Sequence, residues 1–202
     1  MEGSALTPAA MTEGVTFDQT GRLLLDDLND SDARFASQGI SGEWFTYSDG
    51  TSTLAPPDHT GLPSMDGEAH VAGQGFSEWG AGLSAYFRSV DLSQFHGVAI
   101  RARGTGTVVV ELATPATSPP NEGGTCMGTG CFGHFSATVE LGSEHQDFAL
   151  PFGSLTQPTW AQPADLALNG VISINLVAKL AGGAANIDLW VDRLELYIAQ
   201  VP

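Results

Sequence analysis

Short runs of apolar residues alternate with polar ones along this chain, and turn-forming clusters such as SDGTST, APPDHTGLP and AGGAAN separate them. No stretch of 12 or more residues has the period of an amphipathic helix, and at most a short helical turn is expected near Phe152–Leu155 or Ala164–Asn169. Many short strands with long connections predict an all-β fold, a two-sheet β-sandwich. The predicted strands are Arg22–Leu28, Trp44–Tyr47, Ala81–Phe87, Val98–Arg103, Thr107–Ala113, Phe135–Leu141, Gln146–Pro151, Val171–Val177 and Ile187–Tyr197.

The chain divides into a short leading segment and one domain. Residues 1–20 are small, polar and aperiodic, and we interpret them as a flexible tail or linker remnant. The whole length of 202 residues fits one domain better than two, so residues 21–202 are predicted to form a single domain.

The charge balance restricts the partners. Seven lysines and arginines against 23 aspartates and glutamates give a net charge of −16, and Lys179 is the single lysine. Nucleic acid and anionic membrane surfaces bind basic patches, so the composition argues against both as partners and disfavours polyanionic substrates. No apolar run approaches the ~20 residues of a membrane helix.

Compartment is indicated by composition and by two cysteines. Low lysine with abundant Gly, Ser and Thr is typical of secreted bacterial proteins. The opening MEGSALTPAAMTEG lacks the basic start and apolar stretch of a signal peptide, so an exported protein would be a mature form with a new start Met. Cys126 and Cys131 lie five apart among glycines, and we expect a disulfide between them in an exported protein, with free thiols as the alternative.

Alternation assigns faces to several predicted strands. Val98, Ile100 and Ala102 form an apolar set, which leaves Arg101 and Arg103 on the other face. In the last strand the same pattern puts Trp190 on a polar face with Asp188 and Asp192. Such a face is either ordinary solvated surface or a sugar-binding groove, and the pattern alone favours the former.

Catalytic motifs are absent from the sequence. The five histidines are scattered, and no lipase, zinc-protease, P-loop or β-lactamase motif occurs. A glycosidase needs two carboxylates across a cleft, and none of the 23 acidic residues has a recognisable acid–base setting. Glu111 lies in mid-strand among apolar residues; the favoured interpretation is an exposed ion pair with Arg101 or Arg103.

Two further features leave alternatives open. The acidic segment from Asp26 to Asp32 is either a solvated loop or a source of oxygen ligands for Ca²⁺. Tryptophans near strand ends are either core residues or platforms on which sugar rings stack, with core the more common role for any single one.

Five segments carry a family resemblance: LLLDDLND, GEWFTYSDGT, GQGFSEWGAGLSAYF, VDLSQFHGVAIRARG and IDLWVDRLELY. With TPATSPPNEGGTCMGTGCFGHF they resemble family-11-type carbohydrate-binding modules of the galactose-binding jelly-roll superfamily, including relatives in secreted myxobacterial proteins. The resemblance spans about Leu23 to Tyr197 and implies a jelly roll that grips a polysaccharide on a concave sheet.

The resemblance also implies site residues. A structural Ca²⁺ would be held by Asp27, Asp30 and Asp192, although Asn29 and Arg193 stand where the family motifs have acids. The family's tyrosine-rich groove is not evident in the sequence. Residues expected to contact the ligand come from the polar sheet face and from loops: Arg101, Arg103, Trp190, Trp79, His134 and Trp160.

The sequence therefore predicts a secreted, non-catalytic domain that binds a neutral polysaccharide of the β-glucan or xylan type, with a catalytic domain as partner in the native context. A glycoside hydrolase or polysaccharide lyase on the same scaffold is the alternative, and an assembly protein that makes only protein contacts is a third. On this hypothesis, replacing Trp190 by Ala abolishes affinity and leaves the melting temperature nearly unchanged.

Overall fold

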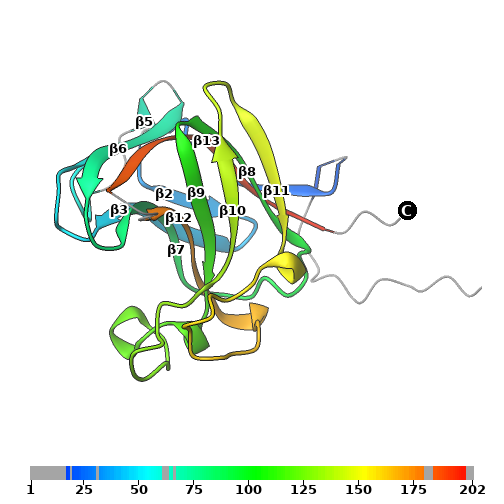
Figure 1. The fold of residues 1–202 in the computed structure, drawn as a ribbon. Coiled ribbons are helices and arrows are strands. Elements are labelled where there is room, and N and C mark those ends of the chain that lie inside the picture. The colour runs from blue at the N-terminus through cyan, green and yellow to red at the C-terminus, as the bar shows by residue number, and fades with distance from the viewer. Residues whose placement is uncertain are drawn as a thin grey trace, which may run out of the picture.

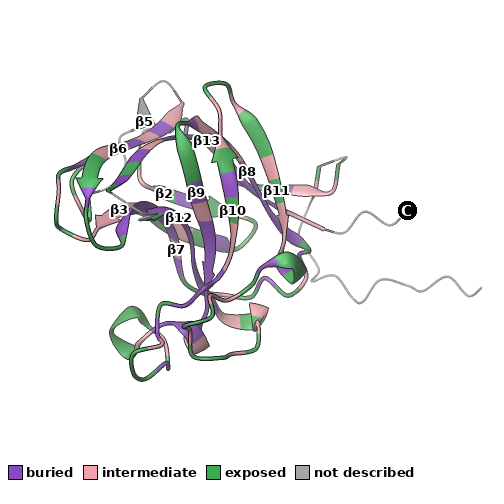
Figure 2. Ribbon diagram, viewed as in Figure 1, coloured by how far each residue is buried: buried purple, intermediate pink, exposed green. Residues whose placement is uncertain are grey.

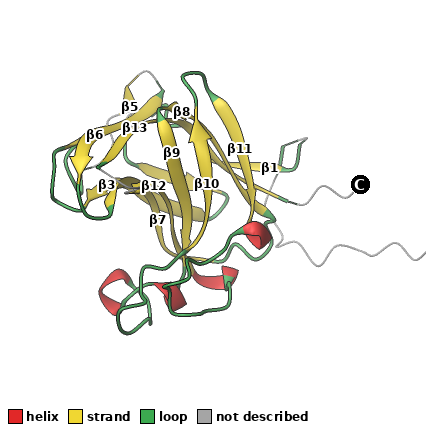
Figure 3. Ribbon diagram, in the orientation of Figure 1, coloured by secondary structure: helices red, strands yellow, loops and turns green. Residues whose placement is uncertain are grey.

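The computed structural model describes residues 17–18, 20–30, 32–60, 64–65, 67–179 and 184–198, and the predicted tail lies almost wholly outside them. The described residues form two antiparallel sheets packed face to face (Figure 1), joined by loops and four 3₁₀ turns of three residues each (Figure 3). The predicted all-β sandwich is confirmed. No helix in the described part of the chain is long and apolar enough to cross a membrane.

One sheet, here called the β13 sheet, has seven strands in the described chain. Its central strand, β13 (Ala185–Tyr197), pairs with β8 (Gly97–Gly104) on one side. On its other side β13 pairs with β6 (Glu68–Phe76) and, farther along, with β1 (Arg22–Asp26). In spatial order the sheet contains β11 (Gln146–Pro151), β8 (Gly97–Gly104), β13 (Ala185–Tyr197), β6 (Glu68–Phe76) and β4 (Leu54–Ala55), with β1 (Arg22–Asp26) beside β13 and β5 (Ser64–Met65) beside β6.

The other sheet, the β12 sheet, has six strands in the described chain. They lie in the order β10 (Phe135–Leu141), β9 (Gly106–Ala113), β12 (Val171–Lys179), β7 (Gly80–Val90), β3 (Ile40–Ser48) and β2 (Arg34–Ser37). The short strand β2 forms one edge and β10 the other.

Buried residues recur along the strands of both sheets (Figure 2), and the hydrophobic core that they form lies between the two sheets. The β13 sheet supplies Ile100 and Leu189, and the β12 sheet supplies Leu83, Ile174 and Leu176, all at most 2% exposed. Because neighbouring residues of a strand point to opposite faces, this core fixes which side chains reach the outer faces. The alternation predicted for β8 and β13 is confirmed.

The predicted strands match β1, β3 and β7 to β13 to within a few residues, but β2, β4, β5 and β6 were not predicted. The largest omission, β6, pairs with β13 over six residues. Its sequence EAHVAGQGF contains Gly73 and Gly75, which weaken the strand signal. A Cβ at Gly73 would lie 2.8 Å from the ring of Phe76, so close packing accounts for this glycine.

Two long loops meet at one end of the β12 sheet (Figure 3). The first, residues 114–134, contains two 3₁₀ turns, Pro115–Thr117 and Pro120–Glu122, and the predicted disulfide between Cys126 and Cys131. The second runs between β11 and β12 and begins and ends with 3₁₀ turns, Phe152–Ser154 and Leu168–Gly170. The backbone N–H of Gln162 donates to the carbonyl of Gly130 at 3.0 Å, which ties the loops together.

Candidate functional site

A groove of about 750 Å³ lies on the outer face of the β12 sheet. Strands β3, β7, β12 and β9 form its floor, and loops at both ends of these strands form its walls. The volume falls in the range of small-molecule sites.

The floor carries a row of polar residues, because every second residue of each strand points outward and several of these are polar. Phe45 is opposite Ser84, Ser84 is opposite Asn175, and Asn175 is opposite Glu111, so one row crosses four strands. The hydroxyl of Ser84 donates to Oδ1 of Asn175 at 2.8 Å. This row presents hydroxyl, amide and carboxyl groups to the groove, flanked by the ring of Phe45.

Aromatic rings form the wall at the β3 side. The rings of Tyr47 and Trp79 stack, with centroids 5.6 Å apart and planes 29° apart. The ring of Phe45 lies 6.0 Å from those of Tyr86 and His59. Trp79 remains 43% exposed, so part of its surface is open to a ligand.

The opposite wall comes from the two loops. Phe132 is 52% exposed and Trp160 57%, unusually high values for such large apolar side chains. Both line the groove together with Cys131 of the disulfide. The side-chain amide of Gln157 donates to the carbonyl of Gly133 at 2.7 Å, which helps to hold this wall in place.

A buried ion pair lies in the groove. Nζ of Lys179 is 2.5 Å from Oε1 of Glu111, and the glutamate side chain is only 7% exposed. Burial raises the pKa of Glu111, and the ammonium of Lys179 opposes this effect. The expected pair with Arg101 or Arg103 is wrong, because those arginines lie on the other sheet.

Two more polar groups of the groove are buried. Nδ1 of His134 lies 2.8 Å from Oγ1 of Thr117, and burial, helped by the charge of Lys179, lowers the pKa of His134 to about 4. The imidazole is therefore neutral at pH 7. The hydroxyl of Tyr47 is buried without a hydrogen-bond partner in the described chain, and burial raises its pKa. An unpaired buried hydroxyl in a groove is a group that a polar ligand can satisfy.

The structure divides the six residues predicted to contact the ligand into two sets. Trp79, His134 and Trp160 line the groove. Arg101, Arg103 and Trp190 belong to β8 and β13 and lie on the outer face of the β13 sheet, so the two sets cannot share one groove.

Trp190 has both ring faces covered by its own chain. The ring of His70, across from it on β6, stacks 3.7 Å away at 9°. The guanidinium of Arg103, across from it on β8, lies 4.2 Å from the ring centroid. Since the two partners come from opposite neighbouring strands, they occupy opposite faces of the indole. Neither face is left for a sugar ring.

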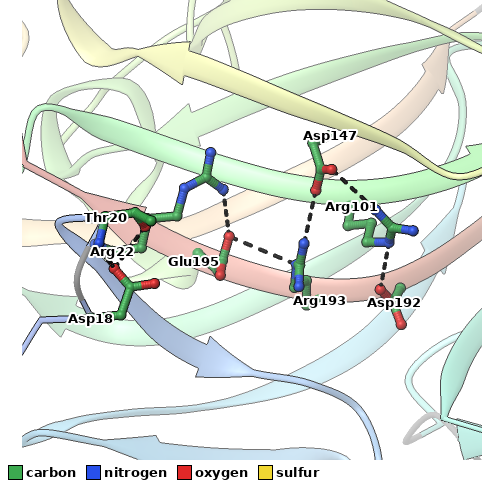
Figure 4. A network of polar contacts seen from close by, with 8 residues as sticks. All are labelled: Asp18, Thr20, Arg22, Arg101, Asp147, Asp192, Arg193 and Glu195. Atoms are coloured by element: carbon green, nitrogen blue, oxygen red, sulfur yellow. Dashed lines mark hydrogen bonds and ion pairs between the residues drawn. The ribbon is translucent and has the colours of Figure 1, made fainter.

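Arg101 belongs to a network of ion pairs on the same outer face (Figure 4). Its Nε lies 3.0 Å from a carboxylate oxygen of Asp192, and its Nη1 lies 3.1 Å from one of Asp147. Arg193 binds the other oxygen of Asp147 at 3.1 Å. The two arginines lower the pKa of Asp147 against the opposing effect of burial.

The residues predicted for Ca²⁺ do not form a donor cluster. In the part of the chain that the structure describes, no three His, Cys, Asp or Glu side chains gather in a way that could hold a metal. Asp192 pairs with Arg101, while Asp27 and Asp30 each accept a backbone N–H two residues along the chain. The Ca²⁺ site stays a prediction.

Sequence reasoning missed much of the groove. Tyr47, Tyr86 and Phe45 line it, so a pair of tyrosines is present although the tyrosine-rich groove was not evident. Alternation in β3 was the available signal: Trp44 is 1% exposed in the core, and its indole N–H donates to the carboxylate of Asp26 at 2.7 Å. If Trp44 points inward, its neighbour Phe45 points outward.

Comparison with solved structures gives matches over nearly the whole chain. The family 11 carbohydrate-binding module from Clostridium thermocellum, in complex with a β-1,3-1,4-mixed-linked tetrasaccharide, aligns with a TM-score of 0.61 and 18% identity, covering 92% of this chain and 100% of that one. The fold is that of a family 11 carbohydrate-binding module. The family 11 carbohydrate-binding module of the cellulosomal cellulase Lic26A-Cel5E of Clostridium thermocellum aligns with a TM-score of 0.62 and 18% identity, over 92% and 99% of the two chains. Comparison with protein-family models finds no match, and comparison with curated proteins finds none.

Proposed function

We propose that this protein binds a neutral polysaccharide of the β-glucan or xylan type in the groove of the β12 sheet, without chemistry. The observation that carries the proposal is the composition of the groove: partly exposed aromatic rings on two facing walls, Trp79 on one and Phe132 and Trp160 on the other, above a hydrogen-bonding floor. Sugar rings present C–H faces that stack on aromatic rings, and their hydroxyls pair with amide, hydroxyl and carboxyl groups.

The dimensions of the floor suit a chain molecule. Four strands from β3 to β9 span roughly 14 Å at the ~4.8 Å spacing of neighbouring strands, which is room for about three sugar rings. The row from Phe45 through Ser84 and Asn175 to Glu111 lies across the strands, so we infer that the glycan runs in that direction.

Charge supports a neutral backbone. Glu78, Glu111 and Glu122 line the groove against a single lysine, and the whole chain carries −16. A polymer with a carboxylate on every sugar would meet repulsion along its whole length.

The disulfide between Cys126 and Cys131 supports an extracellular location, because such bonds persist in oxidising compartments. One of the matched modules belongs to a cellulosomal cellulase. By analogy with it, we propose that this protein is secreted and that its binding brings a catalytic domain, in the same chain or an associated one, to the polysaccharide.

A hydrolase or lyase on the same scaffold is the second candidate. The observation in its favour is Glu111, a carboxyl with a raised pKa in the groove, which is the type of group that acts as a general acid. Its tight pairing with Lys179 favours a structural role instead.

Affinity electrophoresis against a panel of soluble β-glucans, xylans and polyanionic glycans tests the proposal, with the same mixtures assayed for new reducing ends. Retardation by a neutral glycan without new ends is the expected result. New reducing ends would establish the enzyme instead. If no glycan retards the protein and no new reducing ends form, a particle size that depends on concentration in light scattering would favour the assembly protein.

A further inference from the structure

A second pocket, of about 740 Å³, lies at the β2 edge of the β12 sheet. It is built from β2, β3, β7 and the loop before β2, and Tyr86 lines both this edge pocket and the groove. The edge pocket is therefore adjacent to the groove, beside the β3 end of the proposed glycan path.

Two arginines distinguish the edge pocket from the rest of the surface. In the described chain, each of the other basic side chains, those of four arginines and Lys179, has a carboxylate partner within 4.0 Å. Arg34 and Arg88 have none, both are exposed, and both line this pocket. In so acidic a protein, two unpaired guanidinium groups in one pocket mark a place for an anionic group.

The backbone of Arg88 is the second observation. Its φ of 72° lies in the left-handed region, which is unfavourable for a residue with a side chain. Here β7 contains a bulge, because Val171 of β12 pairs with Val90 while Ser173 pairs with Tyr86. Bulges redirect side chains, and strained backbone is concentrated at functional sites. The bulge explains how Arg88 comes to line the edge pocket.

Carboxylates in the same pocket restrict the anion. Asp30, Asp32 and Glu43 also line it. Asp32 accepts the backbone N–H of Arg34 at 2.6 Å, and Glu43 lies directly opposite Arg34 across the β2–β3 ladder. Acceptors beside guanidinium donors suit a group that carries one carboxylate and several hydroxyls. A phosphate diester or a sulfate monoester, which brings charge and no donors, would be repelled.

We propose that the edge pocket binds a uronic acid substituent carried by the same polysaccharide, with Arg34 and Arg88 pairing with its carboxylate and the acidic residues accepting its hydroxyls. This inference rests on the proposed function and refines its ligand class to a neutral β-linked backbone with sparse acidic side groups. A sparse substituent avoids the repulsion that a polyuronate would meet in the groove.

The test compares a glucuronic-acid-substituted xylan with its carboxyl-reduced form, in which the same chain carries neutral glucose. The wild-type protein is expected to bind the acidic polymer about ten-fold more tightly, by a difference that salt reduces. Arg34→Gln and Arg88→Gly should each lose most of that difference and keep the affinity for the reduced polymer.

Two controls separate folding from recognition. Glycine suits the positive φ at position 88, so Arg88→Gly should melt no lower than the wild type. Arg101→Gln removes the same charge from the other sheet and should leave both affinities unchanged. Equal wild-type affinity for the two polymers, or equal losses for both in the edge-pocket variants, would overturn the inference alone. Failure to bind either polymer would overturn it together with the proposed function for xylans.

Discussion

Two tryptophans on opposite sheets give the sharpest test of how this protein binds. Replacing Trp79 by Ala removes a partly exposed ring of the groove wall, whereas replacing Trp190 by Ala removes a ring whose faces are covered by His70 and Arg103. The two variants should therefore lose different properties.

The stability change follows from the contacts of each ring. Trp190 stacks on His70, worth about 0.5–1.5 kcal/mol, and carries a cation–π contact with Arg103, worth about 0.5–2 kcal/mol. Trp190→Ala should lower the free energy of unfolding by about 1–3.5 kcal/mol, which is about 2–14 °C in melting temperature for a domain of this size. In the described chain Trp79 stacks on Tyr47 alone, so Trp79→Ala should lower the free energy of unfolding by about 0.5–1.5 kcal/mol.

Glycan affinity should change in the opposite sense. An aromatic contact that dominates a binding site contributes more than about 1 kcal/mol, so Trp79→Ala should weaken binding at least about five-fold. Trp190→Ala should leave it unchanged. Affinity electrophoresis and thermal unfolding of both variants measure the two effects. A Trp190→Ala protein that keeps its melting temperature and loses its affinity would refute this reasoning and restore the polar face of the β13 sheet as the binding surface.

Three further predictions concern charge and metal. Lys179→Met should lower the free energy of unfolding by about 1–2 kcal/mol at pH 7, a value discounted because the lysine side chain is 38% exposed. The folded-state pKa of Glu111 is already raised, and loss of the Lys179 ammonium would raise it further. The loss of stability should therefore vanish in urea titrations below the unfolded-state pKa of the glutamate, near pH 4, where the folded and unfolded states both hold the proton. The double variant with Glu111→Gln should recover stability at pH 7, and a loss that is equal at both pH values would contradict the pairing. The pKa of His134 is about 4 in the folded chain against 6.5 in the unfolded chain, so the unfolded chain takes up the proton first and the free energy of unfolding falls as the pH drops from 6.5 to 4. His134→Asn should remove up to about 3 kcal/mol of this loss of stability. An unchanged dependence of stability on pH would exclude His134 as its source. The Ca²⁺ prediction requires the melting temperature to rise with added Ca²⁺ and to fall with EDTA, and indifference to both would end it.

Strand positions with strong alternation were accessible from the sequence. In β8, Val98, Ile100 and Ala102 alternate with Arg101 and Arg103, and this pattern separates the core face from the outer face without further information. The glycine-containing strand β6 and the short strands β2, β4 and β5 lacked such a pattern. Strand β6 depends on pairing with β13, far along the chain, which a local window does not contain. Strands β2, β4 and β5 have only four, two and two residues, which is too short to show a period.

The composition of the site followed a similar division. The sequence offered three loop residues as ligand contacts, Trp79, His134 and Trp160, and all three line the groove. It also placed Trp190 on an outward face, which is correct. A sandwich has two outward faces, one on each sheet, and the alternation within one strand does not show which sheet the strand belongs to.

The sequence by itself determined the fold class and the faces of the strongest strands, and it favoured the disulfide, because period and cysteine spacing are local properties of the chain. Only the tertiary structure decided which sheet carries the groove, that Glu111 pairs with Lys179, and that Trp190 is enclosed by His70 and Arg103. Each of these depends on the order in which strands lie side by side. That order is set by packing of the whole core, and it brings together residues such as Glu111 and Lys179 that are 68 positions apart in the chain (179 − 111 = 68).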